Sequence, residues 1–203
     1  MSDVLVVKLG GTTVAEQAGA LESVGRLARR RPLVVVHGGG ARLTDWSNRL
    51  GLATRFEDGL RVTDAPALEV AAAVLRGLVN IELVAALRRL GCDAVGLSGV
   101  DGGLLIAERV PGKGLVASVV DVRRALLDAL LVGGQVPVVA PLALDEQAEL
   151  CNVNADDVAA GIAAGVGARQ LVLLTDVDGI RDADGDRLSS IGADEAERLI
   201  GSG

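Results

Sequence analysis

Short runs of valine, leucine and isoleucine alternate along this chain with longer amphipathic segments, and this alternation limits the possible folds most strongly. Each run ends near a glycine, a proline or a polar residue, which is typical of buried strands that lead into loops. Strands that alternate with helices are joined by right-handed crossovers, which build a mostly parallel sheet between layers of helices. The runs that we predict to be strands are Val4–Leu9, Leu33–His37, Ala94–Ser98, Val136–Ala140 and Leu171–Thr175.

The longer segments carry apolar residues at helical spacing. Asp121 and Asn154 are interpreted as N-caps of the helices that follow them, with Asp157 at the third position of the second of these helices. The predicted helices are approximately Val14–Arg30, Leu43–Leu50, Pro66–Leu78, Ile81–Leu90, Val122–Val132, Ala155–Gly165 and Ala193–Ile200.

Two segments depart from this alternation. Leu104–Ala107 and Leu115–Val120 flank a Pro-Gly-Lys-Gly turn, which predicts a hairpin or a small mixed extension. Asp184-Gly185 is a second turn signal and predicts the tip of another hairpin. The length of 203 residues suits one domain, or one domain built of two lobes.

The composition argues against several classes of partner. A net charge of −7, with one Phe, one Trp and no Tyr, is the opposite of what nucleic-acid binding requires. No apolar run approaches the ~20 residues of a membrane helix, and the N-terminus lacks a signal-peptide pattern. Cys92 and Cys151 stand far apart, without a CxxC pair or Cys/His cluster, which indicates reduced thiols in a cytoplasmic protein and no metal site.

Glycine clusters follow the first two predicted strands, at Gly10-Gly11 and at Gly38-Gly39-Gly40. Ligands of open parallel sheets bind beyond the carboxyl ends of the strands, and a glycine run that enters a helix presents N–H groups to phosphate oxygens. The chain has no GxxxxGK[ST] motif, and Leu43 stands where a dinucleotide fingerprint needs its third glycine. One glycine run fits a tight turn equally well, but two runs favour phosphate binding.

Lysine and histidine are rare in this chain, so their positions are informative. Lys8 and Lys113 are the only lysines among 20 basic residues. A lysine beside Gly10-Gly11 suggests that a compact ammonium group is needed there, the alternative being a lysine that snorkels from the end of a strand. Lys113 is predicted to be a solvated loop residue. His37, the only histidine, has no partner at triad spacing and is interpreted as structural.

A polar run precedes and enters the sixth predicted helix. Capping accounts for Asn154 but leaves Asn152 and Asp156 unexplained. Asp156 could orient Lys8, and Asn152 could bind an amide or a carboxylate of a substrate. Arg61, just before another predicted helix, is either a surface residue or a bidentate clamp for a carboxylate.

Together these residues resemble the amino acid kinase family, and within it the acetylglutamate kinase branch of arginine biosynthesis. The order and spacing match from about Val4 to Gly201, and the combined signal is specific although each motif alone is weak. The motifs are Lys8-Leu9-Gly10-Gly11, Val36-His37-Gly38-Gly39-Gly40, Gly59-Leu60-Arg61-Val62-Thr63, Gly96-Leu97-Ser98-Gly99, Asn152-Val153-Asn154-Ala155-Asp156 and Leu174-Thr175-Asp176-Val177-Asp178-Gly179-Ile180.

The resemblance implies an α/β fold, a three-layer αβα sandwich with a mostly parallel central sheet. It implies transfer of the γ-phosphoryl group of ATP, which carries Mg²⁺, to the side-chain carboxylate of N-acetyl-L-glutamate. Lys8 would neutralise charge on the transferring group with help from the N–H groups of Gly11 and Gly39, and Asp156 would orient Lys8. The residues implied to hold N-acetyl-L-glutamate are Gly39, Gly40, Arg61 and Asn152. Those implied to line the nucleotide site are Gly10, Asp176, Val177, Asp178, Gly179, Ile180 and Arg181.

The resemblance also divides the chain into two lobes. Residues 1–167 would bind N-acetyl-L-glutamate and dimerise, and residues 168–203 would form an incomplete nucleotide lobe, because related kinases continue with a second catalytic lysine. The strand Leu171–Thr175 would be central in that lobe but left here with an open edge and exposed Val and Leu. We therefore expect these residues alone to bind N-acetyl-L-glutamate weakly and ATP poorly and to turn over negligibly, with activity recovered when a family-like C-terminal segment is restored.

The resemblance finally implies a homodimer, with the helices around Pro66–Leu90 as its candidate surface. Because the first strand begins at about Val4, without a helix before it, the dimer would be insensitive to arginine. Two alternatives remain open. One is a sister kinase that acts on carrier-linked aminoadipate or glutamate, and the other is a truncated kinase-like module that binds without turnover.

Overall fold

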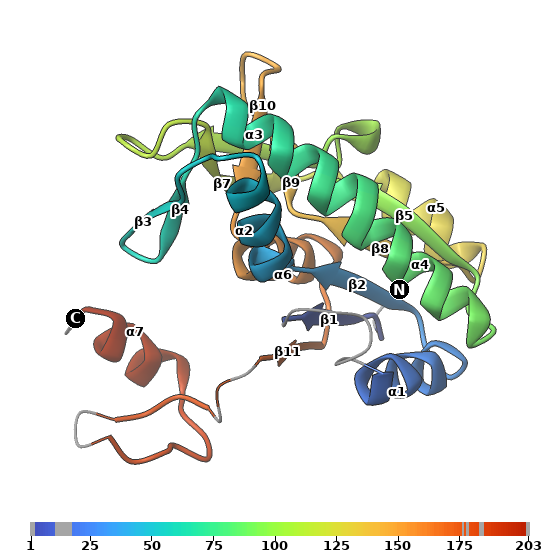
Figure 1. The fold of residues 1–203 in the computed structure, drawn as a ribbon. Coiled ribbons are helices and arrows are strands. Elements are labelled where there is room, and N and C mark those ends of the chain that lie inside the picture. Colours follow the sequence, from blue (N-terminus) through green and yellow to red (C-terminus); the bar gives the residue numbers. More distant parts are fainter. Residues whose placement is uncertain (1–2, 11–17, 176, 178, 183–184, 202–203) are drawn as a thin grey trace.

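A five-stranded parallel sheet forms the centre of the protein in a computed structural model that describes residues 3–10, 18–175, 177, 179–182 and 185–201. The strand order is β11-β1-β2-β8-β5 (Figure 1). All five predicted strands are confirmed, with ends that differ by at most one residue. They are β1 (Leu5–Leu9), β2 (Leu33–His37), β5 (Ala94–Ser98), β8 (Val136–Ala140) and β11 (Gln170–Leu174).

Helices cover both faces of this sheet, so the predicted three-layer αβα sandwich is confirmed (Figure 1). Successive residues of a strand point to opposite faces, and both sets are apolar here. Leu5, Val7, Leu33 and Val35 belong to the core on the side of α1 (Ala18–Ala28) and α4 (Asn80–Arg89). The core on the other side contains Val4, Val6, Val34 and Val36 with side chains of α5 (Ala125–Val132) and α6 (Ala155–Val166).

The two helices predicted at Pro66–Leu78 and Ile81–Leu90 are one continuous helix. It consists of α3 (Ala65–Ala71), a π-helical stretch η1 (Ala72–Val79) and α4. No residue at the predicted break lacks a backbone N–H, and Asn80 is buried inside the molecule rather than used as a cap. By length and composition alone this helix is long and apolar enough to cross a membrane, which corrects the expectation of no such run. Its Leu83 and Leu87 are nevertheless buried against the sheet.

A small closed barrel stands beside the sheet. Its strands are β6 (Leu105–Arg109), β7 (Val116–Val122), β9 (Leu142–Leu144) and β10 (Leu150–Val153). The predicted hairpin is the β6–β7 pair, so the sequence indicated half of the barrel. The N-cap prediction for Asp121 was wrong, because β7 continues through Val122 and α5 begins only at Ala125.

Three short segments near the carboxyl ends of the strands complete the fold. Helix α2 (Gly40–Arg49) follows β2 directly, at the glycine cluster. A two-stranded hairpin is formed by β3 (Arg55–Glu57) and β4 (Leu60–Val62). A 3₁₀ turn, η2 (Asp101–Gly103), follows β5.

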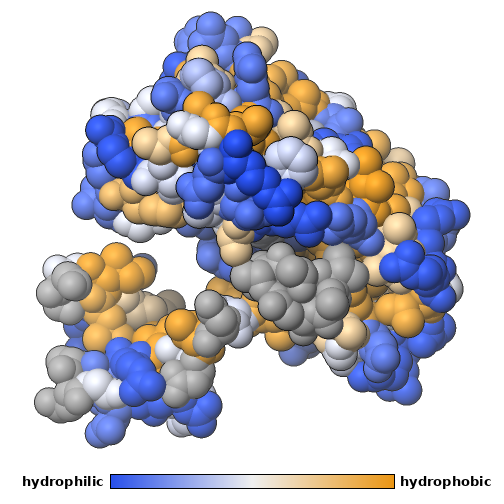
Figure 2. Space-filling model, viewed as in Figure 1, coloured by the Kyte–Doolittle hydropathy of each residue, from blue (hydrophilic) through white to orange (hydrophobic). Residues whose placement is uncertain are grey.

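The strand β11 lies at an edge of the sheet and, among the described residues, pairs only with β1. Val172 and Leu173 are 38% and 47% exposed, as expected for an open edge. The segment after β11 leads to α7 (Ala193–Gly201), which lies apart from the sheet (Figure 1). Apolar side chains, among them Val177, Ile180 and Ile200, are exposed on this segment (Figure 2).

Candidate active site

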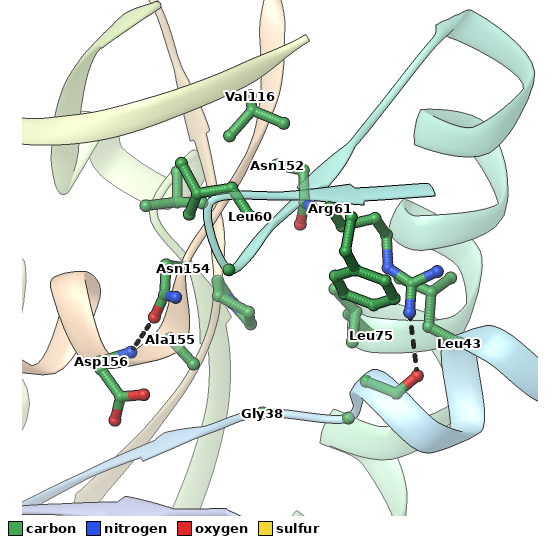
Figure 3. A pocket seen from close by; sticks show the side chains of 16 residues that line it. Gly38, Leu43, Leu60, Arg61, Leu75, Val116, Asn152, Asn154, Ala155 and Asp156 are labelled. Carbon is green, nitrogen blue, oxygen red and sulfur yellow. Dashed lines mark hydrogen bonds between the residues drawn. The ribbon is translucent and has the colours of Figure 1, made fainter. Parts of the chain in front are cut away.

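A pocket of about 270 Å³ opens beyond the carboxyl end of β2, between the glycine cluster and the start of α6 (Figure 3). The hairpin β3–β4 forms another wall, and α2, η1, the barrel strands β7 and β10 and the loop before β9 contribute further side chains. Ligands of open parallel sheets bind beyond the carboxyl ends of the strands, which is where this pocket lies. The residues that line it are Gly38, Gly39, Gly40, Leu43, Phe56, Gly59, Leu60, Arg61, Leu75, Val116, Pro141, Asn152, Val153, Asn154, Ala155 and Asp156.

Lys8 and Asp156 form an ion pair at the edge of this pocket, although 148 residues separate them in sequence. The ammonium nitrogen of Lys8 lies 3.0 Å from Oδ1 and 3.2 Å from Oδ2 of Asp156. The side chain of Lys8 is 11% exposed and that of Asp156 is 53% exposed. The pair therefore holds the lysine in one place at the end of β1, while the carboxylate stays in contact with solvent.

The start of α6 fixes the position of Asp156. Asn154 is the N-cap, as predicted, and its Oδ1 accepts the N–H of Asp156 at 2.7 Å (Figure 3). A carboxylate in the first turn of a helix is stabilised by the helix dipole. Asp157, predicted at the third helical position, accepts the N–H of Val119 at 2.8 Å and so ties α6 to β7.

The glycine cluster after β2 turns sharply into α2. Gly39 has a φ of 145°, a conformation that L side chains rarely adopt, and a Cβ there would come 2.8 Å from Cδ2 of Leu75. Its carbonyl accepts the N–H of Leu43 at 2.9 Å. Within the described part of the chain, the N–H groups of Gly39 and Gly40 have no acceptor. They are therefore available to an anion at the positive end of α2.

Gly10 allows β1 to end close to β11. Its N–H donates to the carbonyl of Leu174 at 2.7 Å, and a Cβ at Gly10 would come 2.7 Å from the same oxygen. That Cβ would also lie 3.3 Å from the ammonium nitrogen of Lys8. Glycine is thus required where Lys8 folds back over the strand end. Gly11, which the resemblance implicates, lies outside the described residues.

Arg61 points from β4 across the mouth of the pocket. Its guanidinium donates to Oγ1 of Thr44 at 2.7 Å, to Oγ1 of Thr54 at 3.1 Å and to the carbonyl of Gly40 at 3.2 Å. The ring of Phe56 covers its other face at 4.8 Å. Burial lowers the pKa of Arg61 below its usual value, although a guanidinium stays charged in proteins. Arg61 is thus a half-buried cation beside the glycine cluster.

Asn152 lies in β10 and is 9% exposed. Its Nδ2 is 3.4 Å from Oγ1 of Thr63, a long contact that leaves most of the amide's hydrogen-bonding capacity for a ligand. Arg61, Asn152 and Asp156 therefore line one pocket from three different elements, and Lys8 joins them from β1 through its ion pair with Asp156.

The residues predicted to line the nucleotide site do not line this pocket. Of that set, Gly10, Val177, Gly179, Ile180 and Arg181 are described, and Asp176 and Asp178 lie outside the described residues, as does Asp184 of the second predicted turn. Val177 and Ile180 are 64% and 56% exposed. They follow β11, which pairs with β1, so this segment begins beside the strand that carries Lys8. Arg181 and Arg187 form an isolated antiparallel β-bridge, in agreement with the hairpin predicted at Asp184-Gly185.

The sequence interpretation missed the apolar wall of the pocket and misjudged Lys113. Leu43, Phe56, Leu60, Leu75 and Val116 line the pocket; the only signal was that Phe56 is the sole phenylalanine in the chain. The side chain of Lys113 is only 12% exposed and pairs with Asp58 at 2.7 Å and Glu57 at 3.2 Å, so the prediction of a solvated residue was wrong.

The chemical character of the site is that of an anion pocket in an acidic protein. Two cations, two helix N-termini and backbone N–H groups meet there, although the chain carries a net charge of −7. His37, next to the glycine cluster, is 1% exposed, and burial lowers its pKa to about 4. It is therefore neutral near pH 7 and adds no charge.

Comparison with known proteins gives one consistent family. The model of the amino acid kinase family matches residues 3–203. An acetylglutamate kinase from Rubrobacter xylanophilus is 48% identical over 200 residues, which cover 98% of this chain and 78% of the relative. An acetylglutamate kinase from Methanopyrus kandleri is 49% identical over 183 residues, which cover 86% of this chain and 72% of the relative.

Solved structures agree with this assignment. The N-acetylglutamate synthase of Neisseria gonorrhoeae, in complex with coenzyme A and N-acetyl-glutamate, superimposes with a TM-score of 0.82 and 26% identity. That match covers 100% of this chain and 48% of the synthase chain.

Proposed function

The chain belongs to the amino acid kinase family, and we propose that within it the protein is an ATP-dependent acetylglutamate kinase of arginine biosynthesis. The observation that supports this most directly is the ion pair of Lys8 and Asp156 beside the glycine cluster, in a pocket that also contains Arg61 and Asn152. Relatives that are 48% and 49% identical carry the same name.

In the proposed reaction an oxygen of the side-chain carboxylate of N-acetyl-L-glutamate attacks the γ-phosphorus of ATP. A bond forms between this oxygen and phosphorus, the bond from phosphorus to the β-γ bridging oxygen breaks, and ADP leaves with that electron pair. No proton moves, and the product is an acyl phosphate. Catalysis of such a transfer rests on position and charge rather than on acid or base groups.

Lys8 is suited to the charge on the transferring group because Asp156 holds its ammonium within 3.0–3.2 Å and most of its side chain is buried. The N–H groups of Gly39 and, by resemblance, Gly11 would donate to the same oxygens. ATP would bind beside β1 and β11, with Gly10 and residues 176–181 around it and with Mg²⁺ as part of the nucleotide substrate. In the described part of the chain no cluster of His, Cys, Asp or Glu could itself hold a metal ion.

The acceptor would lie in the pocket between Arg61, Asn152 and the start of α6. The guanidinium of Arg61 would form charge-assisted bonds with the α-carboxylate, and the amide of Asn152 would pair with a polar group of the acceptor. Gly40 would donate its backbone N–H to the acceptor, and Gly39 would line the acceptor with its backbone while its N–H serves the phosphoryl group. The apolar wall around Leu60 and Leu75 would pack against the methylene carbons. Residues 1–167 would then form the acceptor lobe and residues 168–203 part of the nucleotide lobe.

We further propose that the protein is a cytoplasmic homodimer that binds neither nucleic acid nor membrane. Both cysteines are buried, unpaired thiols, which suits a reducing compartment. On the long helix a row of residues at spacing four, Ala73, Gly77, Ile81 and Ala85, is exposed, and small apolar residues at this spacing allow close contact of two helices.

The function is tested by trapping the acyl phosphate with hydroxylamine, with the protein in excess over ATP so that even a slow transfer is measurable. N-acetyl-L-glutamate should give a hydroxamate, whereas L-glutamate and N-acetyl-L-aspartate should give little. Lys8→Ala should lower the rate constant of transfer about a hundredfold or more and change the affinity for N-acetyl-L-glutamate little.

Lys8→Arg should fail as well, because a planar guanidinium cannot take the place of a compact ammonium. Arg26→Ala, on the outer surface of α1, is the matched control and should transfer at the unaltered rate. A protein completed with a family-like C-terminal segment that gives no hydroxamate with N-acetyl-L-glutamate would refute the proposed function, and a Lys8→Ala variant of unchanged rate would refute the role of Lys8.

A further inference from the structure

A buried chain of hydrogen bonds runs from the long helix to the glycine cluster of the pocket. Asn80 and His37 are 0% and 1% exposed. Nδ2 of Asn80 lies 3.0 Å from Nε2 of His37, and Nδ1 of His37 lies 2.7 Å from the carbonyl oxygen of Gly38. Neither side chain lines the pocket, so a direct contact with substrate does not account for their arrangement.

The neighbours of Asn80 determine which way its amide faces. Oδ1 accepts a hydrogen bond from Nη1 of Arg76 at 3.2 Å, and Nδ2 donates to the carbonyl of Val138 at 2.8 Å. The reversed amide would direct its N–H groups at the guanidinium and its oxygen at a carbonyl oxygen, and both contacts would be repulsive. Two acceptors remain for the second hydrogen of Nδ2, and Nε2 of His37 at 3.0 Å is closer than the carbonyl oxygen of Leu97 at 3.4 Å. Nδ2 therefore donates its second hydrogen to Nε2 of His37.

This donation determines the tautomer of the histidine. An Nε2 atom that accepts a hydrogen bond carries no proton, so the proton of the neutral ring is on Nδ1. The Nδ1–H group then donates to the carbonyl oxygen of Gly38. The ring cannot rotate to another partner, because it is enclosed by the core.

The Gly38 carbonyl is in turn coupled to the N–H of Gly39. A peptide unit is planar and trans, so its carbonyl and its N–H point in opposite directions. Holding the Gly38 oxygen against His37 turns the Gly39 N–H away from His37. On its other side Gly39 is closed in by Leu75 and Val79, because an added Cβ would lie 2.8 Å and 3.3 Å from their side-chain carbons.

We propose that His37 and Asn80 are positioning residues that hold the Gly39 N–H toward the transferring phosphoryl group. The proposal rests on the proposed function for the identity of that group. It assigns to His37 a second task besides core packing, and to Asn80 a task that the sequence did not indicate.

The strand β5 provides space for the amide of Asn80 in this hydrogen-bond chain. Gly96 lies in β5 opposite Asn80, and a Cβ at Gly96 would come 2.3 Å from Oδ1 of Asn80. A glycine inside a strand is typical of a site where another group approaches closely. Arg76 also donates to the carbonyl of Gly96 at 3.0 Å. The amide of Asn80 thus lies between its own helix and β5, where the missing side chain of Gly96 provides the space for it.

The tautomer can be measured without reference to activity. The chain contains one histidine, so protein labelled with ¹⁵N-histidine gives the signals of a single imidazole. We expect a neutral ring near pH 7 with a protonated Nδ1, the form that is less populated in water. In Asn80→Leu the Nε2 atom loses its donor, while Nδ1–H keeps the Gly38 carbonyl as its acceptor. The Nδ1–H form should therefore persist, and the ¹⁵N signal of Nε2 should shift to that of a nitrogen that accepts no hydrogen bond. An Nε2–H or a protonated ring in the unaltered protein would overturn the proposal.

Kinetic variants test the link to the Gly39 N–H. His37→Asn places an amide Nδ2 donor where Nδ1 of the imidazole stands, whereas His37→Leu places none, and both variants leave Asn80 without its histidine partner. The single-turnover rate of His37→Leu and of Asn80→Leu should fall about tenfold or more. The rate of His37→Asn should stay within about threefold, and the affinity for N-acetyl-L-glutamate should change little in all three.

Leu83→Ala is the control for general loss of packing, because Leu83 lies on the same helix, is almost equally buried and belongs to the apolar core, with no polar side-chain atom for the hydrogen-bond chain. It should lower the melting temperature without lowering the rate well below that temperature. Equal rates in His37→Leu and His37→Asn, or an equal loss in Leu83→Ala, would overturn the positioning role. A protein completed with a family-like C-terminal segment that shows the expected tautomer but no transfer to any acceptor would refute the proposed function instead. A shift of the Gly39 amide signal on addition of N-acetyl-L-glutamate would then still support the orientation of that N–H.

Discussion

Few residues give the pocket its positive character. Lys8 is held by Asp156, and Arg61 is held by two threonines and a carbonyl. The partner carboxylate of Lys8, on Asp156, is half exposed and thus partly screened by solvent, and no carboxylate pairs with Arg61 among the described residues. Each cation can therefore attract an anionic group while its own position is already determined.

Arg61 is the residue whose loss should affect the acceptor most selectively. Arg61→Ala should raise the Kd for N-acetyl-L-glutamate about tenfold to a hundredfold, as expected when a charge-assisted hydrogen bond is lost, and leave the Kd for ATP nearly unchanged. Isothermal titration calorimetry measures both values. Arg55→Ala is the control on the same hairpin, since the side chain of Arg55 is 70% exposed. Equal losses for both ligands would point to a structural role for Arg61.

The buried His37 should make stability depend on pH. Burial and the nearby charge of Arg76 disfavour the imidazolium and lower its pKa to about 4, below the ordinary 6.5. A lowered pKa in the folded state gives stability that is complete above the unfolded value and is lost as the pH falls from 6.5 toward 4. Between about pH 7 and pH 5 the loss should be about 2 kcal/mol.

Urea unfolding at the two pH values measures this loss. His37→Asn is the control, because it cannot take up a proton there, and most carboxylates remain ionised above pH 5. The variant should show a much smaller pH dependence than the unaltered protein. Equal pH dependence in both would show that His37 is not the titrating group.

At the scale of elements, the hairpin β3–β4 depends on the turn between β6 and β7. Lys113, in that turn, reaches Glu57 and Asp58 at the tip of the hairpin. The backbone adds two bonds, from Thr63 N–H to the carbonyl of Lys113 at 3.2 Å and from Leu115 N–H to the carbonyl of Thr63 at 2.7 Å. The wall that carries Phe56 and Arg61 is thus fastened at both its tip and its base.

Lys113→Ala should loosen the tip while the base stays fixed. Hydrogen exchange of the amides in residues 55–62 should become faster. The affinity for N-acetyl-L-glutamate should fall by less than about tenfold, because ion pairs whose carboxylates are exposed to solvent, as those of Glu57 and Asp58 are, contribute little each. Arg124→Ala removes another ion pair, to Asp128 at 2.8 Å, in α5 and serves as the control. Faster exchange in Arg124→Ala as well, or in neither variant, would contradict an anchoring role for Lys113.

At the scale of the whole molecule, the long helix presents two different surfaces. One side buries Leu83 and Leu87 against the sheet and Asn80 against His37. The other side exposes a row that includes Ile81, which is 57% exposed. An apolar row of this kind on a folded protein indicates an association surface.

We expect a homodimer through this row, with a mass twice the 20.6 kDa of the chain. Ile81→Glu should convert the dimer to monomer, because two carboxylates would face each other across a symmetric contact. Val132→Glu is the control, since Val132 is 77% exposed at the end of α5. Light scattering coupled to gel filtration measures the mass. A monomeric or hexameric unaltered protein, or a dimer that survives Ile81→Glu, would contradict this surface.

The sequence by itself determined the strands, most of the helices and the type of chemistry. Runs such as Leu33–His37 are local signals. Consecutive valines in a five-residue segment are typical of a strand that buries side chains on both faces of a sheet. The same holds for Asn154, whose capping bond reaches only two residues along the chain, and for Gly39, whose φ of 145° favours glycine. These features depend on neighbours in sequence, so they can be predicted from it.

Only the tertiary structure decided how distant residues meet. The predicted break before Ile81 disappeared because Asn80 finds its partners in β2, β5 and β8 rather than at a helix end. Lys113 looked solvated because its acidic partners lie more than 50 residues earlier in the chain, and β9 and β10 close the barrel around a hairpin that alone seemed complete. Contacts of this kind arise from packing between elements that are distant in sequence. Hydrophobic periodicity and turn chemistry are local patterns, so they do not predict such contacts.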